Sequence, residues 1–185
     1  RDGEEAIVSF GQGCEGEPAL AAATIVKAVE KIRVETDRGT INMNTNGGHT
    51  GGVAEICRAG LDSIRVSLIS AREDTYNAYY RPAGFSLADV RNTLKNAVAA
   101  GVYTSLNLLV FPGLTDREDE LTALLELVRD TGINMVQLRN LNIDPDLLFS
   151  HLPENKKEIL GIPALIRAFE EVPGLNLGNF SRPVK

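Results

Sequence analysis

The segment Tyr103-Thr-Ser-Leu-Asn-Leu-Leu-Val-Phe-Pro-Gly-Leu-Thr-Asp116 decides the fold class, because it holds a strand pattern and a polar connection directly before a helical pattern. Residues 103–110 are a short run rich in aliphatic side chains, as buried strands are. Residues 117–129 then place apolar side chains with a helical period, and Gly132 follows them, as glycine commonly follows a helix. The segment therefore predicts one strand–loop–helix unit.

The same unit recurs along the whole chain. Together with residues 103–110, the expected strands are Ala6–Phe10, Thr40–Asn44, Ser63–Leu68, Met135–Asn140 and Leu175–Phe180. The expected helices are Ala19–Val34, Val53–Arg58, Glu73–Tyr79, Ser86–Ala100, Arg117–Arg129 and Ala164–Glu171. Strands that alternate with helices in this way are parallel and are joined by right-handed crossovers.

Several residues mark where these helices begin and end. Thr115 with Glu118, and Ser86 with Asp89, predict capping boxes at two helix starts, and Pro163 suits the first turn of the last helix. Each short return from a helix to a strand carries a glycine that is expected to end the helix. These glycines are Gly39, Gly60, Gly101, Gly132 and Gly174.

The connections that lead from a strand to a helix are longer and more polar. They are residues 11–18, 44–48, 67–72, 111–116 and 140–144. In parallel α/β folds, ligands bind at the carboxyl ends of the strands. We therefore expect the function of the chain to reside on these five loops.

Polar and apolar side chains alternate along the strands, so that one face of the sheet is polar. The expected polar positions are Asn42, Asn44, Asn46, Arg65, Ser67, Ser105, Asn107, Gln137 and Arg139. A closed eightfold barrel fills its interior with bulky apolar side chains, whereas a polar interior needs water or a polar ligand. The pattern predicts an α/β fold, a partial, open TIM-like (β/α)6 barrel with parallel strands that holds a polar molecule. A strand face open to solvent is the alternative.

Length and composition limit the possible partners. The 185 residues suffice for one buried core, so residues 1–185 are expected to form a single domain. A net charge of −6 excludes a basic surface for nucleic acid or anionic membrane and favours a small-molecule or peptide partner. No apolar run approaches the roughly 20 residues of a membrane helix. Two isolated cysteines, Cys14 and Cys57, fit a reducing cytoplasm.

Residues 11–16 satisfy the pattern G-x-G-x-x-G after a strand, which is the fingerprint of dinucleotide binding. Two features oppose this interpretation. The next strand ends in Asn44-Thr45-Asn46 and not in an acidic residue. Glu15 and Glu17 would also repel a pyrophosphate at the helix start. A carboxylate there suits a cation, such as the ammonium group of a ligand, and the dinucleotide site remains the alternative.

Read as an ammonium site, Gly16-Glu17-Pro18 resembles the Gly-Gly-Glu motif of radical S-adenosylmethionine (radical SAM) enzymes. Asn44-Thr45-Asn46-Gly47 is similar to the run that ends the family's third strand, and residues 63–70 resemble its fourth. Residues 108–116 resemble the fifth strand with its glycine turn, and residues 137–142 lie where the sixth contacts adenine. The resemblance assigns residues 1–145 to strands two to six and leaves 146–185 as a C-terminal helix and strand.

The resemblance implies a cofactor site for S-adenosylmethionine, with Glu17 binding the amino group of its methionine part. The implied cofactor-binding residues are Gly16, Glu17, Pro18, Asn44, Thr45, Asn46, Ser67, Ser70, Val110, Gly113, Leu138 and Asn140. It further implies that the intact protein carries a [4Fe–4S] cluster and generates a deoxyadenosyl radical for hydrogen abstraction. No catalytic residue and no metal ligand of this chain is assigned.

The chain departs from the family in one large respect. The family binds its cluster through C-x-x-x-C-x-x-C, and cluster ligation needs several thiolates close together. Here Cys14 and Cys57 stand far apart. Because Ala6–Phe10 matches the family's second strand, truncation would place the motif upstream of Arg1, and loss in a degenerate homologue is the alternative. As it stands, the chain is expected to be inactive.

Two arginines on the polar face, Arg65 and Arg139, are the candidates for holding an acidic substrate, because guanidinium groups bind carboxylate or phosphate. Pairing with a carboxylate of the sheet is the alternative. Two other functions stay open. One is a cluster-free barrel lyase or aldolase, although the strand ends offer no lysine for it. The other is a non-catalytic barrel that binds a metabolite.

Overall fold

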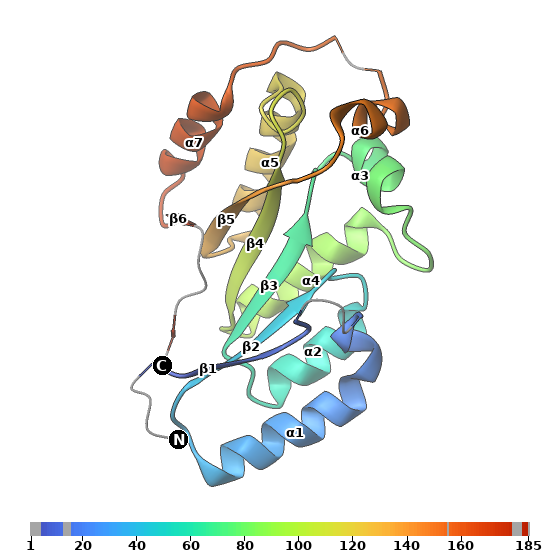
Figure 1. Ribbon diagram of the computed structural model, residues 1–185. Coiled ribbons are helices and arrows are strands. Elements are labelled where there is room, and N and C mark those ends of the chain that lie inside the picture. The colour runs from blue at the N-terminus through green and yellow to red at the C-terminus, as the bar shows by residue number, and fades with distance from the viewer. Residues whose placement is uncertain (1–4, 13–15, 155, 179–182, 185) are drawn as a thin grey trace.

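The sheet of the computed structural model, which describes residues 5–12, 16–154, 156–178 and 183–184, has six strands in chain order. The strands are β1 (Ile7–Phe10), β2 (Thr40–Thr45), β3 (Ser63–Leu68), β4 (Tyr103–Val110), β5 (Met135–Asn140) and β6 (Asn176–Gly178). Every neighbouring pair is parallel, and the sheet does not close (Figure 1). The predicted partial, open (β/α)6 barrel is therefore confirmed.

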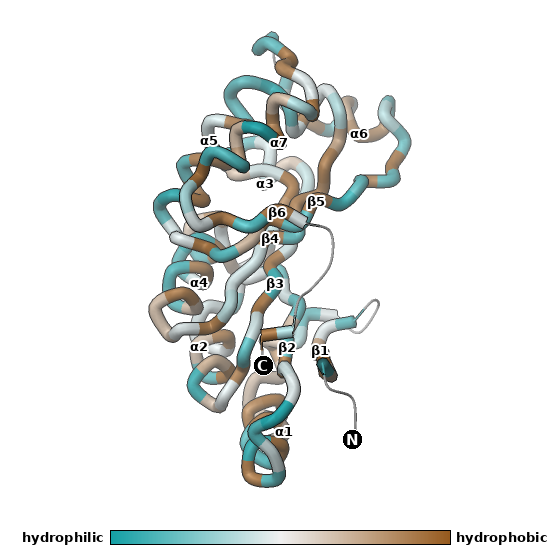
Figure 2. Tube along the Cα trace, turned by 90° about the vertical axis from the view of Figure 1, so that its left-hand side faces the viewer, coloured by the Kyte–Doolittle hydropathy of each residue, from teal (hydrophilic) through white to brown (hydrophobic). Residues whose placement is uncertain are grey.

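One face of this sheet is covered by a single layer of helices. The layer consists of η1 (Pro18–Ala21), α1 (Ala22–Glu35), α2 (Thr50–Arg58), α4 (Leu87–Ala99), α5 (Glu118–Thr131) and α7 (Ile162–Glu170). The short helices α3 (Glu73–Tyr80) and α6 (Pro145–His151) lie at the carboxyl ends of the strands (Figure 1). Contacts run in the order α1, α2, α4, α5 and α7, and Figure 2 shows α2 and α4 on one side of the strands. Right-handed crossovers between parallel strands place the helices on the same face.

The main core fills the space between the helices and the apolar face of the sheet. Met43, Ile64 and Leu106 are completely buried on the strands, and Ile56 and Leu94 meet them from the helices. The predicted alternation along the strands is thus correct for the apolar half. The opposite, concave face keeps the polar side chains.

The end of the described chain returns to the base of the sheet. The amide of Val184 donates to Thr40 Oγ1 at 2.9 Å, at the first residue of β2. Residues 183–184 therefore lie at the amino ends of the strands, the edge opposite to the strand-to-helix loops (Figure 1).

The predicted element boundaries are confirmed to within a few residues, with three differences. The first helical segment opens with the 3₁₀ turn η1 before α1 begins. Helix α6 was not predicted, since its seven residues are too short for a clear helical period. Of the expected strand Leu175–Phe180, β6 covers Asn176–Gly178, and residues 179–180 lie outside the described residues.

One of the two predicted capping boxes is wrong. Helix α5 has Arg117 as its N-cap, and Thr115 instead accepts a hydrogen bond from the amide of Phe111 at 2.9 Å inside the preceding turn. The box of Ser86 and Asp89 at α4 and Pro163 in the first turn of α7 are confirmed.

Of the five return glycines, Gly60, Gly101 and Gly132 lie at or directly after the C-cap of their helices, as predicted. Helices α1 and α7 end several residues before Gly39 and Gly174, so these two glycines do not end them.

We expect Ser86→Ala to lower the free energy of unfolding by about 1 kcal/mol, because the first turn of α4 loses the oxygen that accepts from the amide of Asp89. Urea denaturation measures this change. Ser86→Thr, which keeps a hydroxyl cap, is the matched control and should stay close to the parent chain. Equal loss in both variants would contradict the assignment of the cap.

Candidate cofactor site at the carboxyl ends of the strands

The carboxylate of Glu17 joins the first strand-to-helix loop to the end of β2. Its Oε1 accepts from the amide of Ala19 at 3.0 Å and from Thr45 Oγ1 at 2.5 Å, while its Oε2 accepts from the amide of Asn46 at 2.7 Å. Glu17 is thus a helix-capping residue and a cross-link between two loops. An ionised carboxylate has about four lone-pair positions, so three protein donors leave room for one donor of a ligand.

The residues at the end of β2 form one corner with Glu17. Thr45 Oγ1, the donor to Glu17, also accepts from the amide of Gly47 at 3.0 Å. Asn46 Oδ1 accepts from the amide of Gly48 at 2.8 Å, which fixes the turn after the strand. The structure therefore brings the predicted residues Glu17, Thr45 and Asn46 into direct contact.

Asn44 and the glycines of the first loop complete this corner. Asn44 Nδ2 donates to the carbonyl of Gly11 at 3.2 Å, and a Cβ on Gly11 would meet the carbonyl oxygen of Asn44 at 2.3 Å. Only glycine permits this approach at the φ of +75° that Gly11 adopts. Gly16, directly before Glu17 and Pro18, is exposed, and within the described part of the chain no other group lies within 4 Å of its Cβ position.

Ser67 extends the site to the third and fourth strands. Its hydroxyl is half-buried on the concave face and accepts from Asn107 Nδ2 on β4 at 3.4 Å. This hydrogen bond is long, and both side chains keep capacity for a ligand. Ser67 on β3 and Asn107 on β4 lie one and two strands beyond the end of β2, where Glu17 is bound, at the same edge of the sheet.

The deeper part of the concave face satisfies much of its own hydrogen-bonding capacity. Buried Asn42 donates to Ser9 Oγ at 3.0 Å and accepts from Ser63 Oγ at 2.8 Å. Near the other edge, Arg65 Nη1 donates to Gln137 Oε1 at 3.5 Å. The expectation that these polar residues need a ligand is therefore wrong for Asn42, because Ser9 and Ser63 on the neighbouring strands pair with it.

Four predicted residues of the later strands offer mainly backbone to this edge. Val110 and Leu138 pack their side chains against the core, and Asn140 is exposed. Gly113 has a φ of +83° and donates its amide to Asp116 Oδ1 at 2.6 Å, which holds the turn after β4. These positions agree with a contact through main-chain atoms, as the resemblance implies for the adenine side.

Ser70 lies apart from the other predicted residues. It is fully buried, donates to Glu120 Oε2 at 2.5 Å and accepts from the amide of Arg72 at 2.9 Å. Its hydroxyl therefore points to a buried carboxylate at the start of α5.

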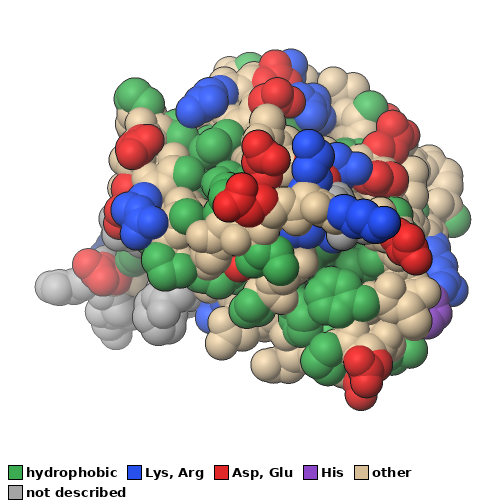
Figure 3. Space-filling view, turned by 90° about the horizontal axis from the view of Figure 1, so that it is seen from above, with side chains coloured by type: hydrophobic (Ala, Val, Ile, Leu, Met, Phe, Trp, Pro, Cys, Tyr) green, Lys and Arg blue, Asp and Glu red, His purple; other side chains and the backbone are tan. Residues whose placement is uncertain are grey.

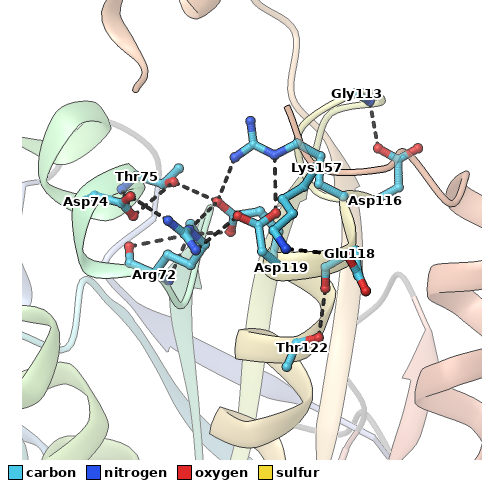
Figure 4. Close-up of polar contacts among 12 residues, drawn as sticks. Arg72, Asp74, Thr75, Gly113, Asp116, Glu118, Asp119, Thr122 and Lys157 are labelled. Atoms are coloured by element: carbon cyan, nitrogen blue, oxygen red, sulfur yellow. Dashed lines mark hydrogen bonds and ion pairs between the residues drawn. The ribbon is translucent and has the colours of Figure 1, made fainter. Parts of the chain in front are cut away.

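A buried cluster around Glu120 was missed by the sequence reasoning (Figure 4). Besides Ser70, Glu120 accepts from Thr75 Oγ1 at 2.6 Å and Arg117 Nη2 at 3.2 Å. Arg72 bonds to Asp74, and its Nη1 lies 3.0 Å from Asp119 Oδ2. Burial raises the pKa of Glu120, and the hydrogen bonds from the two hydroxyls oppose that shift. The cluster attaches two segments to the first turn of α5. These segments are the loop after β3 and the first turn of α3.

A sequence signal for this cluster existed. Glu120 precedes Leu121 and Leu124 on the buried side of the helix, so a carboxylate stands where an apolar residue would ordinarily lie. A buried carboxylate requires partners, and the hydroxyls and arginines nearby in the sequence could have suggested them.

The rim of the strand-end loops carries mixed charge. Figure 3, viewed from above, shows lysine and arginine side chains interspersed with aspartate and glutamate. Because neither sign of charge dominates this rim, we expect a charged ligand to be recognised by side chains of the concave face and not by the outer surface.

The described residues do not fit an iron–sulfur cluster. They contain no group of three or more His, Cys, Asp and Glu side chains that could hold a metal ion. Cys57 is buried on α2, and burial raises the pKa of its thiol to about 11, so it offers no thiolate near neutral pH. Cys14 and Glu15 lie outside the described residues. In the same described part, no helix has the length and apolar character needed to cross a membrane.

Residues 5–127 match the sequence model of the Radical SAM superfamily. The structure is similar to a domain of pyruvate-formate lyase-activating enzyme from Bacteroides vulgatus ATCC 8482, with a TM-score of 0.67, 12% identity, and coverage of 95% of this chain and 99% of that one. It is also similar to the FeFe-hydrogenase maturase HydG from Carboxydothermus hydrogenoformans, with a TM-score of 0.62, 18% identity, and coverage of 97% and 43%.

A further similar structure is Streptococcus suis SuiB bound to S-adenosylmethionine, with a TM-score of 0.58, 12% identity, and coverage of 95% of this chain and 39% of that one. At these identities the likeness shows the fold alone. The chain spans about two-fifths of the HydG and SuiB chains. A search of curated protein sequences found no match.

We expect Glu120→Ala to lower the free energy of unfolding by about 3–5 kcal/mol, because Arg117, Ser70 and Thr75 lose their shared buried partner. Chemical denaturation checks this value. Glu118→Ala, at an exposed residue 3.8 Å from Lys157 Nζ, is the control and should cost about 0–1 kcal/mol. A loss as small as that of the control would refute a structural role for the cluster.

Proposed function

Since the chain belongs to the radical S-adenosylmethionine (radical SAM) superfamily, we propose that the carboxyl ends of β1 to β5 bind S-adenosylmethionine, with Glu17 holding the ammonium group of its methionine part. The observation that carries the proposal is the position of Glu17. Its carboxylate stands at the sheet edge, bonded to Thr45 and Asn46, and retains capacity for one more donor. A charge-assisted hydrogen bond to an ammonium group is the strong interaction that such a carboxylate can make.

The remainder of the cofactor has matching positions along the same edge. Ser67 and Asn107 present a hydroxyl and an amide at the next strands, which suits the ribose hydroxyls. The main chain around Val110, Gly113, Leu138 and Asn140 lies at the same edge and is the proposed contact for adenine, although the carbonyl of Val110 and the amide of Gly113 already have partners in Leu141 and Asp116. The exposed residue Gly16 lets the amino-acid part approach the loop closely.

When bound, S-adenosylmethionine supplies radical hydrogen abstraction, which in this superfamily requires a [4Fe–4S] cluster. This chain contributes binding and orientation. Glu17 fixes the amino-acid end of the cofactor, the strand-end backbone fixes the adenine end, and the concave face below them is left to the substrate. The intact protein would act on a small molecule or a peptide.

We expect Glu17→Gln to weaken the binding of S-adenosylmethionine about tenfold to a hundredfold, since a charge-assisted hydrogen bond contributes about 1.5–3 kcal/mol. The single amide oxygen can still accept from Ala19 and Thr45, whereas the amide of Asn46 loses the oxygen that accepts from it in the parent chain. Isothermal titration calorimetry of the 185-residue chain measures the affinity, with Glu30→Gln on the exposed side of α1 as the control.

A second ligand separates recognition from folding. Methylthioadenosine lacks the amino-acid part, so its affinity should be the same for the parent chain and Glu17→Gln. Equal weakening of both ligands would show that Glu17 acts only by holding the loop, and unchanged binding of S-adenosylmethionine would reject the assignment altogether.

We further expect that the chain alone does not cleave S-adenosylmethionine, because its sequence holds two cysteines and a cluster of this family needs three. Chromatography for 5′-deoxyadenosine after reconstitution with iron, sulfide and dithionite is the measurement. Formation of this product in a catalytic amount would contradict the expectation.

A further inference from the structure

Arg65 lies in the middle of β3, on the concave face below the proposed cofactor. Its register partners are Asn44 on β2 and Ser105 on β4, whereas Ser67 pairs with Asn107 one row closer to the carboxyl ends. Two residues along a strand span about 7 Å. The backbone of Arg65 therefore lies one row deeper in the sheet than Ser67 and Asn107, and its guanidinium reaches Gln137, which is the register partner of Asn107.

Two other arginines with buried or mostly buried side chains have a carboxylate partner, whereas Arg65 has none among the described residues. Arg33 pairs with Asp62, and Arg117 pairs with Glu120. Within residues 5–12, 16–154, 156–178 and 183–184, no carboxylate lies within 4.0 Å of the Arg65 guanidinium, whose hydrogen-bond partner is the neutral amide of Gln137 at 3.5 Å.

The surroundings of Arg65 add to this imbalance. The side chain is half-buried, and burial together with the nearby positive charge of Arg139 lowers the pKa of Arg65. Removing a cation from water next to a second cation is unfavourable unless an anion approaches. Arg65 has five N–H donors in a planar fork, and that geometry matches a carboxylate or phosphate in a bidentate arrangement.

We propose that Arg65, with Gln137 beside it, binds an anionic group of the substrate, so that the protein acts on a small molecule or peptide that carries a carboxylate or phosphate. The inference rests on the proposed function, because that function places the cofactor at the carboxyl ends of the same strands. Arg139 increases the positive potential on the same side of the sheet. The neutral amide of Gln137 accepts one N–H of Arg65, while its own Nε2 donates to Met135 Sδ at 3.9 Å, so Gln137 positions the guanidinium.

The first test measures stability, which requires no knowledge of the substrate. Arg65→Gln should raise or leave unchanged the urea midpoint, since it removes a half-buried cation that has no carboxylate partner in the described chain. Arg33→Gln is the matched control and should lower the midpoint, because Asp62 loses its partner. A decrease for Arg65→Gln as large as that of Arg33→Gln would overturn the proposal and make Arg65 structural.

The second test detects the anion directly, by ¹⁵N NMR of the Arg65 Nε–H resonance. Titration with succinate should shift this resonance, whereas succinamide should not. Inorganic phosphate tests the other anion class, and a shift with either anion supports the site. Arg65→Gln should weaken the binding of the effective anion at least tenfold, as followed through the backbone amides of β3. Absence of a shift with both anions would overturn the proposal.

A third experiment distinguishes a carboxylate of the substrate from the carboxylate of S-adenosylmethionine. In the proposal, saturation with S-adenosylmethionine leaves the anion titration intact, and Arg65→Gln retains the parent affinity for S-adenosylmethionine. If S-adenosylmethionine itself shifts the Arg65 resonance and blocks succinate, the anion is that of the cofactor and the substrate proposal fails. If S-adenosylmethionine does not bind while succinate does, the proposed function fails and the anion site stands.

Discussion

The position of every strand-end loop in the candidate site depends on the right-handed crossover between parallel strands. Six parallel strands in chain order, joined by crossovers of the same hand, place the helical layer on one face and the carboxyl ends at one edge. The apolar half of each strand must then face the helices. The polar half is left on the concave face, where it lines the volume that a ligand can enter.

Given that arrangement, the strand-end loops need fixed positions, and carboxylates provide them. Glu17 ties the first loop to the end of β2, and Glu120 ties the loop after β3 to the start of α5. In both cases one carboxylate gathers donors from segments that are far apart in the sequence. Such contacts cost little entropy once the parallel sheet has formed, and they hold neighbouring loops in register with each other.

The strands, three of the five return glycines and the polar face could be predicted because each depends on a short local pattern. Leu106 and Leu108 alternate with Ser105 and Asn107 wherever the strand is placed, and Gly132 must adopt a left-handed conformation. The fold class followed from these patterns alone. Glu17 was also singled out from sequence, since its charge contradicts the phosphate site that the surrounding glycines suggest.

What could not be predicted depends on tertiary contacts. Thr115 and Glu118 have the spacing of a capping box, but the turn after β4 uses the Thr115 hydroxyl for the amide of Phe111. Ser70 has the sequence neighbourhood of a cofactor ligand and turns instead to Glu120, which is 50 residues away. Asn42 similarly pairs with Ser9 and Ser63 on adjacent strands, so its polarity is satisfied within the sheet.

The concave face is thereby divided into two parts with different energetic roles. On the side of β1 to β3, the deep amide and hydroxyls satisfy one another and stabilise the sheet without a ligand. On the side of β3 to β5, burial and the nearby charge of Arg139 lower the pKa of Arg65, so its charged form is less favourable there than in water. Selection for stability alone would replace such a cation by a neutral residue. The position of Arg65 below the strand ends is explained if a bound anion compensates the unfavourable burial of its charge.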